Sequence, residues 1–327
     1  MLFFNIKYRS SDVESKKIVS KYSDRLDKLL SKELEVSRNQ VEKLIKNSLV
    51  KVNQKSITKP SFKVSEGDEI EYEFLEAKKQ EPKEIDFEVQ KLYEDEDVLV
   101  INKPANLVVH PAPSVKEPTL VDWLKKEGIS LSTISGEERH GIVHRLDKDT
   151  SGAMIIAKNN QAHSELAKQL LDRSMGRYYI AIINIPLKEN IIVNKPIARN
   201  PKNRLKMAII EDGREAKTAF SKIRKSKVGN ELIAAKLFSG RTHQIRVHLG
   251  SLNRYILGDS LYAPSSHKFK ERMMLHARVL YFIHPKTKEY IEIEAPLFKD
   301  MKEYLEKNFE GNIDEKITKN SIKSLFS

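Results

Sequence analysis

Residues able to do chemistry gather between Gly141 and Gly152, where the chain places a histidine, an arginine, a lysine and two aspartates. The run 153–157 that follows is apolar and predicts a buried strand. Charged side chains between core-forming segments are costly unless they are paired or used. The segment therefore predicts either a salt-bridged structural loop, in which Gly152 adopts a positive φ, or an active site.

A second polar segment, 239–248, is expected to turn from a strand into a helix. Thr242 is the expected N-cap of that helix, and Ile245 and Leu249 lie at the spacing of its buried face. Arg241 precedes the helix at the turn, where its side chain can reach a cleft.

Two adjacent tyrosines, Tyr178 and Tyr179, open an expected strand that follows a predicted amphipathic helix over 161–172. Successive side chains of a strand point to opposite faces, so only one of the two can enter a given cleft. Two ordinary structural tyrosines are the alternative.

Length and composition indicate a globular protein of two domains. The chain has 327 residues, of which 39% are hydrophobic and 32% charged. Lys and Arg number 58 against 46 Asp and Glu, a net charge of +12, which favours a polyanionic partner such as nucleic acid. The lack of cysteine excludes disulfides and cysteine nucleophiles. The histidine pairs His140/His144 and His243/His248 have no third ligand in the sequence, so we expect no bound metal. The sequence also shows no apolar run of membrane-spanning length and no signal-peptide pattern, so we expect a cytoplasmic protein.

The expected elements divide the chain into five parts. A short strand and a connection occupy 1–21, and two helices with short strands occupy 22–75. A charged linker that contains proline occupies 76–84. A larger domain of strands and helices spans 85–309, and a polar tail, expected to be mobile, spans 310–327.

Four motifs of the larger domain follow one another in fixed order. Residues 144–152 read HRLDKDTSG, residues 102–111 read NKPANLVVHP, residues 240–248 read GRTHQIRVH and residues 258–262 read GDSLY. They resemble the motifs HRLDxxTSG, NKPxGLxVHP, GRxHQIRxH and GDxxY of the RluA/RluC/RluD family, the pseudouridine synthases that modify ribosomal RNA. Asn106 replaces the usual glycine of the second motif. The resemblance implies an α+β fold with a mixed, mainly antiparallel sheet flanked by helices.

Residues 22–75 resemble the S4 RNA-binding domain, a small αβ module. The match consists of RLD at 25–27, SR at 37–38, VKVN at 50–53 and the GD turn at 67–68. By this resemblance five side chains would face RNA, namely Arg38, Lys43, Lys46, Lys51 and Lys55. A plain solvated helix face is the alternative.

The resemblance also implies roles in the larger domain. Asp147 would act at the sugar, either as a nucleophile at C1′ or as a base at C2′, and Arg241 would pair with it and keep it ionised. Tyr179, rather than Tyr178, would stack on the flipped uracil. The residues expected to contact substrate or RNA are Lys103, Arg145, Arg177, His243, Gln244 and Arg246. No cofactor is implied.

The sequence thus predicts an RNA pseudouridine synthase that acts as a monomer on large-subunit ribosomal RNA. One alternative is a catalytically silent RNA-binding or ribosome-assembly factor on the same fold, whose mark would be loss of Asp147, Tyr179 or Arg241. Another is an RNA nuclease, which would need metal-binding carboxylates or a histidine pair in one cleft.

Overall fold

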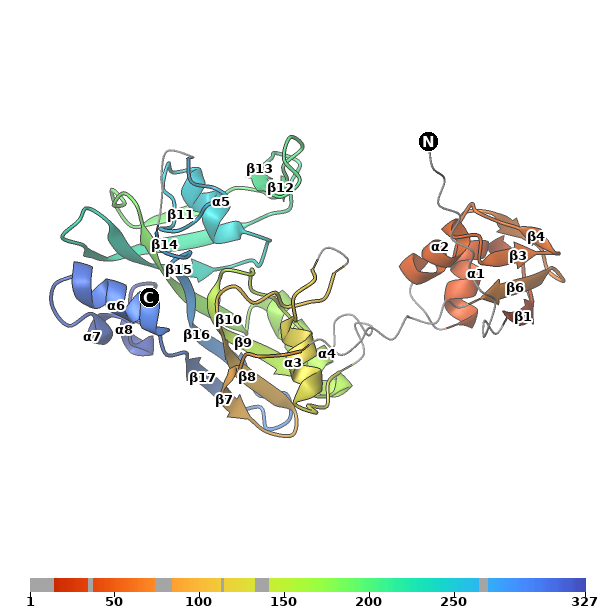
Figure 1. Ribbon diagram of the computed structural model, residues 1–327, viewed down its shortest axis with the longest axis horizontal. Coiled ribbons are helices and arrows are strands. Elements are labelled where there is room, and N and C mark those ends of the chain that lie inside the picture. Colours follow the sequence, from red (N-terminus) through yellow and green to blue (C-terminus); the bar gives the residue numbers. More distant parts are fainter. Residues whose placement is uncertain (1–14, 35–37, 74–83, 113–114, 133–140, 265–269) are drawn as a thin grey trace. The chain divides into compact units, whose positions relative to one another are not determined.

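The computed structural model describes residues 15–34, 38–73, 84–112, 115–132, 141–264 and 270–327. The chain divides into two compact units, Met1–Pro82 and Lys83–Ser327 (Figure 1). The strand expected over 2–8, and the expected linker apart from Glu84, lie outside the described residues. None of the helices in the described part of the chain combines the length and the apolar character that a membrane span requires.

The amino-terminal unit packs two helices, α1 (Leu26–Glu33) and α2 (Arg38–Lys46), with a small antiparallel sheet. The sheet order is β1-β6-β3-β4, and the strands are Ser15–Val19, Glu69–Glu73, Val50–Val52 and Lys55–Ser56. A separate ribbon joins β2 (Asp24–Arg25) to β5 (Lys63–Val64). Because β1 pairs with β6, this unit begins before residue 22, earlier than the sequence predicted.

The larger unit is built on one sheet with the order β11-β14-β15-β10-β16-β9-β8-β7, to which β17 adds by pairing with β16. In that order the strands are Ile191–Asn194, Lys217–Lys225, Glu231–Leu237, Gly176–Ile183, Leu275–Ile283, Ser151–Ala157, Val98–Lys103, Gln90–Glu94 and Tyr290–Glu294. The strands pair antiparallel except β9 with β16, which are parallel. The mixed, mainly antiparallel sheet of the prediction is confirmed.

Helices cover the sheet because its central strands are apolar on both faces. Every residue of β9 and β10 is buried. Helix α3 (Leu120–Lys126) begins with a capping box, in which the Thr119 side chain and Asp122 satisfy each other's backbone N–H groups. Helix α4 (Asn160–Asp172) packs beside β9 and β16 (Figure 1). A short hairpin, β12 (Ile197–Arg199) with β13 (Met207–Ile209), and the helix α5 (Gln244–Gly250) lie toward the other end of the sheet.

The polar tail expected over 310–327 is folded, which corrects the prediction. After α6 (Lys299–Asn308) it forms α7 (Ile313–Lys316) and α8 (Lys319–Ser324). Ile317 and Ile322 are fully buried in the core of the larger unit. Burial of these two isoleucines contributes roughly 1.5–3 kcal/mol each toward holding the segment against the larger unit.

Candidate active site

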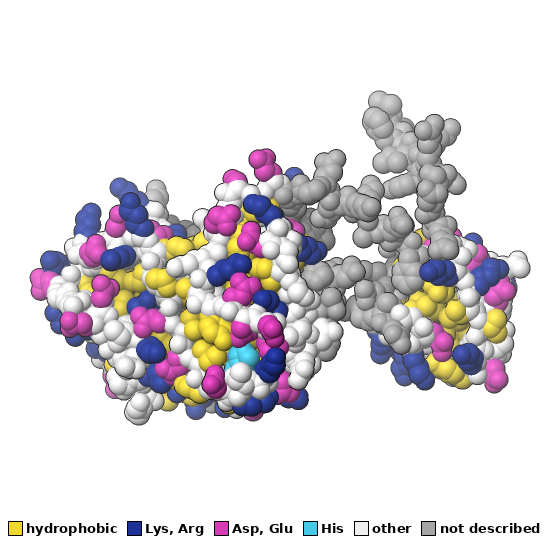
Figure 2. All heavy atoms as spheres, turned by 90° about the horizontal axis from the view of Figure 1, so that it is seen from below, with side chains coloured by type: hydrophobic (Ala, Val, Ile, Leu, Met, Phe, Trp, Pro, Cys, Tyr) yellow, Lys and Arg dark blue, Asp and Glu magenta, His cyan; other side chains and the backbone are white. Residues whose placement is uncertain are grey.

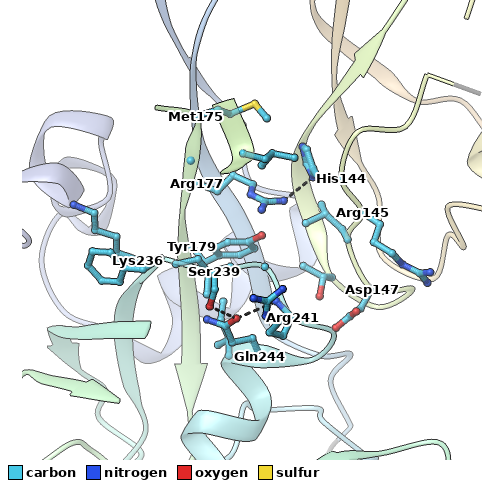
Figure 3. Close-up of a pocket in the computed structure, with 18 of the residues that line it drawn as sticks. His144, Arg145, Asp147, Met175, Arg177, Tyr179, Lys236, Ser239, Arg241 and Gln244 are labelled. Carbon is cyan, nitrogen blue, oxygen red and sulfur yellow. Dashed lines mark hydrogen bonds between the residues drawn. The ribbon is translucent and has the colours of Figure 1, made fainter. Parts of the chain in front are cut away.

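A cleft of about 530 Å³ opens in the larger unit where three segments meet. The loop that precedes β9 forms one wall, and β10 with the end of β15 forms another. The start of α5 completes it. Its lining includes Asp147, Tyr179, Arg241 and Arg246, so the fold brings the separate polar motifs together (Figure 3).

The loop carrying Asp147 is fixed from beneath by a buried lysine. Lys103 has no exposed surface, and its Nζ donates to the carbonyl oxygens of Pro104, Leu107 and Lys148 at 2.7, 2.8 and 3.0 Å. Burial lowers the pKa of Lys103 to about 7. Lys103 therefore holds the loop and does not contact RNA, which corrects the expected role.

A glycine closes the same loop onto the sheet. Gly152 pairs with Ala277 of the parallel strand β16 at φ +116°. A Cβ atom at this position would lie 2.3 Å from the Ala277 carbonyl oxygen. Only glycine fits, and the close approach anchors the loop next to β10, the neighbour of β16.

Two side chains of the α5 segment face Asp147. Arg246 Nη1 lies 3.6 Å from Asp147 Oδ2, and His243 Nε2 lies 3.9 Å from Asp147 Oδ1. Burial lowers the pKa of His243, although the Asp147 charge opposes the shift. The Asp147 carboxylate thus faces the permanently charged guanidinium of Arg246 and the imidazole of His243, which burial keeps neutral.

Arg241 does not take the place expected for it. Its Nε donates to the Glu215 carbonyl oxygen at 2.9 Å, and among the described residues no ion pair joins it to Asp147. The residue that pairs with Asp147 is Arg246, five positions further along the same motif. Arg246 is 6% exposed and binds Asp259 through Nε and Nη2 at 2.7 and 2.8 Å.

The reason lies in how α5 begins. The N-cap is His243 in the left-handed conformation at φ 57°, not the expected Thr242, and it offers no side-chain cap. Gln244 instead ties the helix start to the turn and to β14, because its side chain accepts from the Arg241 N–H at 3.0 Å and donates to the Lys217 carbonyl oxygen at 3.0 Å. Gln244 is therefore a structural residue at the cleft wall, not the RNA contact expected.

The two tyrosines lie on opposite faces of β10, as the alternation predicted. Tyr179 lines the cleft and is 4% exposed, and Figure 3 shows its ring between the Arg177–His144 pair and Arg241. Tyr178 packs on the other face, with ring centroids 5.6 Å from Tyr281 and 5.7 Å from Phe326. Burial raises the pKa of Tyr179, so its hydroxyl stays protonated at neutral pH.

Comparison with known proteins identifies the family. The family described as RNA pseudouridylate synthase matches residues 97–251, and the S4 domain matches residues 24–70. A protein of Helicobacter pylori strain J99 named RNA pseudouridine synthase is 49% identical over 314 residues, which cover 92% of this chain and 95% of that protein. The chain belongs to the RNA pseudouridine synthases.

Further relatives of this pseudouridine synthase agree. A protein of Zymomonas mobilis named ribosomal large subunit pseudouridine synthase D is 38% identical, over 85% of this chain and 91% of its own length. The solved structure of human RNA pseudouridylate synthase domain containing 1 superposes with a TM-score of 0.57 at 22% identity, covering 72% of this chain and 95% of that chain. The latter likeness confirms the fold.

Two further residues expected to contact RNA, Arg177 and Arg145, differ in how exposed their side chains are. Arg177 is 7% exposed and its Nη1 donates to His144 Nδ1 at 2.6 Å, so it forms part of the cleft wall. Arg145 is exposed, and its side chain extends away from Asp147 (Figure 3). Arg145 is therefore the member of the expected set best placed to meet the RNA backbone.

Cations of the S4 domain are partly neutralised within the domain. Arg38 and Arg25 both bind the carboxylate of Asp27, which is fully buried. Lys46 pairs with Glu42 at 3.1 Å, and Lys51 approaches Glu71 at 3.8 Å. The side chain of Lys43 lies outside the described residues. Figure 2 shows basic and acidic side chains mixed on one face of the units, so net charge alone does not locate an RNA surface.

One group among the described residues could offer three metal-ligand atoms, from Asp95, Asp97 and His284. His284 Nε2 lies 2.8 Å from Asp95, and its Nδ1 accepts the Lys286 N–H at 3.2 Å. Asp97 accepts from Asn159 at 2.8 Å. These ligand atoms are already engaged in hydrogen bonds within the protein, and none of the three residues lines the cleft.

A prediction follows for Tyr179. Tyr179→Ala should weaken capture of the substrate RNA by about 1–3 kcal/mol, because the ring expected to stack on the flipped uracil is lost. Tyr179→Phe should keep capture but lose turnover if the hydroxyl moves the C5 proton. Tyr178→Phe is the matched control and should behave as wild type. Single-turnover assays and RNA binding of all three variants provide the measurement, and full activity of both Tyr179 variants would remove this residue from the mechanism.

Proposed function

We propose that the chain converts uridine to pseudouridine in large-subunit ribosomal RNA, with Asp147 as the carboxylate that acts at the sugar. The observation that carries this proposal is the meeting of Asp147, Arg246 and Tyr179 in one cleft. The name of the Zymomonas mobilis relative supports the choice of RNA. A ribosomal RNA substrate would place the reaction in the cytoplasm, and a single chain supplies every group that the chemistry uses.

The reaction is an isomerisation, so atoms balance without a co-reactant. The N1–C1′ bond of uridine breaks, the base turns, and a C5–C1′ bond forms. The proton on C5 is lost and N1 gains one. Asp147 either forms a bond to C1′ or takes the C2′ proton to give a glycal, and both routes need an ionised carboxylate beside the sugar.

Each neighbour of Asp147 then has a task. Arg246 and His243 stabilise the carboxylate from the protein side and leave its other side to the sugar. Tyr179 offers its ring to the uracil, which must leave its stack at a cost of roughly a few kcal/mol. Arg145 and Arg241 lie at the cleft, where they meet the flanking phosphates.

We propose that the S4 domain anchors the RNA and that the domain boundary lies between 76 and 84. A fragment starting at Ile85 should approach full turnover on a short RNA at high concentration. On ribosomal RNA it should bind more weakly and with a shallower salt dependence, because fewer phosphates are neutralised. Binding and turnover at several salt concentrations decide this, and an unchanged salt slope would contradict the anchor role.

Mapping of pseudouridines in a deletion strain tests the substrate. One or a few large-subunit positions should lose pseudouridine and regain it when the wild-type gene returns. Loss confined to transfer RNA or to the small subunit would refute the substrate class. Unchanged modification everywhere would favour the alternative of an RNA-binding factor without catalysis.

A further inference from the structure

We propose that the turn Gly258–Tyr262 positions the two groups that face the catalytic carboxylate. In this proposal Asp259 orients Arg246, and Tyr262 selects the tautomer of His243. Both are positioning residues that act through another side chain. The inference rests on the proposed role of Asp147 and goes beyond it by assigning a task to a turn that does not itself touch the substrate.

Asp259 is held as a rigid partner. It is 2% exposed, and its Oδ1 accepts the backbone N–H groups of Leu261 and Tyr262 at 3.1 Å each. The preceding Gly258 has φ +80°, and a Cβ atom there would lie 2.0 Å from the Arg272 carbonyl oxygen. No other residue fits at this position, so the backbone fixes where the Asp259 carboxylate stands.

The geometry of the Arg246–Asp259 pair leaves one guanidinium edge free for Asp147. The Nε and Nη2 groups of Arg246 donate to the Asp259 carboxylate in a bidentate ion pair, while Nη1 lies 3.6 Å from Asp147 Oδ2. A planar guanidinium can meet two carboxylates in this way, whereas a lysine ammonium gives no fixed second edge. The position of Asp259 therefore determines where the charge beside Asp147 lies.

Tyr262 fixes the imidazole through its hydroxyl. The oxygen accepts the Met207 N–H at 2.7 Å and lies 2.8 Å from His243 Nδ1. Its own proton is then best directed to Nδ1, which places the imidazole proton on Nε2, 3.9 Å from Asp147 Oδ1. The opposite tautomer would turn a nitrogen lone pair toward the carboxylate and leave the Tyr262 proton without this acceptor.

The Tyr262 ring supports the second group as well. Arg246 Cζ lies 4.8 Å from the ring centroid, within the range of a cation–π contact. Tyr262→Phe keeps this ring and removes the hydroxyl, together with its hydrogen bonds to the Met207 N–H and to His243. The variant therefore separates tautomer selection from packing.

The test reads the tautomer of His243 by ¹⁵N NMR in the full-length protein without RNA, with the signal assigned by its absence in His243→Gln. Wild type should show the Nε2–H form, and Tyr262→Phe should shift population to Nδ1–H. Its kcat on RNA should fall about 3- to 10-fold, the effect of one hydrogen bond, with KM unchanged. Tyr255→Phe, which changes a tyrosine outside the cleft lining, should change neither.

Asp259→Asn tests whether Asp259 orients Arg246. It should lower kcat about 10-fold or more while RNA affinity persists, because Arg246 loses its charged partner. The same His243 tautomer in wild type and Tyr262→Phe, or an unchanged kcat in Tyr262→Phe, would overturn the role of Tyr262. Wild-type kcat in Asp259→Asn would overturn that of Asp259. The NMR result does not depend on activity, so a failure of the Asp147 assignment would be recognised separately, by turnover in Asp147→Asn.

Discussion

Asp147→Asn is expected to lower pseudouridine formation by at least roughly 10⁴-fold while RNA binding stays within about twofold of wild type. The amide keeps the size of the side chain but can neither attack C1′ nor take the C2′ proton. RNA affinity persists because a carboxylate contributes nothing to phosphate contacts. Single-turnover rates and filter binding with the same RNA give both numbers.

Asp149→Asn is the matched control for that experiment. Asp149 lies two residues further along the same loop and, unlike Asp147, does not line the cleft. This variant should keep most of the activity. Substantial turnover by Asp147→Asn, or loss of activity only in Asp149→Asn, would show that the wrong carboxylate has been assigned.

Arg246→Gln and Arg241→Gln are expected to differ sharply. Loss of Arg246 removes the cation 3.6 Å from Asp147 and should lower kcat by about 10²–10³, the effect of losing one preorganised charged donor. Arg241 donates to a backbone carbonyl instead, and its loss should change KM for RNA by less than about tenfold with little effect on kcat. Steady-state kinetics on one short RNA make the comparison.

A folding control accompanies Arg246→Gln, because the single change leaves Asp259 buried without a cation and costs roughly 3–5 kcal/mol of stability. The double variant Arg246→Gln, Asp259→Asn removes both charges together and should show the same loss of kcat at near-normal stability. Equal kcat losses in Arg241→Gln and Arg246→Gln would contradict the assignment of the partner.

Much of the site was predictable because the motifs are local. The resemblance of the motifs implied that Asp147 and Tyr179 act in one site, and strand alternation placed Tyr178 on the opposite face of the strand. The partner of Asp147 was predicted wrongly. The helix begins one residue later than its pattern indicated, and Arg246 pairs with Asp259, which lies 13 residues further along the chain. A contact between a helix and a distant turn produces no periodic pattern in the sequence, so the Arg246–Asp259 pair could not be predicted.

Burial explains the other differences. Lys103 has the sequence features of an RNA contact, yet three carbonyl oxygens enclose its ammonium group beneath the loop. The carboxyl-terminal segment is polar overall, but Ile313, Ile317 and Ile322 recur at four- and five-residue spacing and all three are buried. Because a break between α7 and α8 interrupts the spacing, the three isoleucines form no helical period that the sequence could have revealed.

Release of tritium from uridine labelled at C5 tests the central claim most directly, because forming the C5–C1′ bond expels the C5 hydrogen. Purified protein is mixed with large-subunit ribosomal RNA carrying the label, and released tritium is compared with pseudouridine mapped in the same sample. We expect equimolar release and pseudouridine at a few discrete positions for wild type, and neither for Asp147→Asn. Tight RNA binding by wild type without tritium release would contradict the claim.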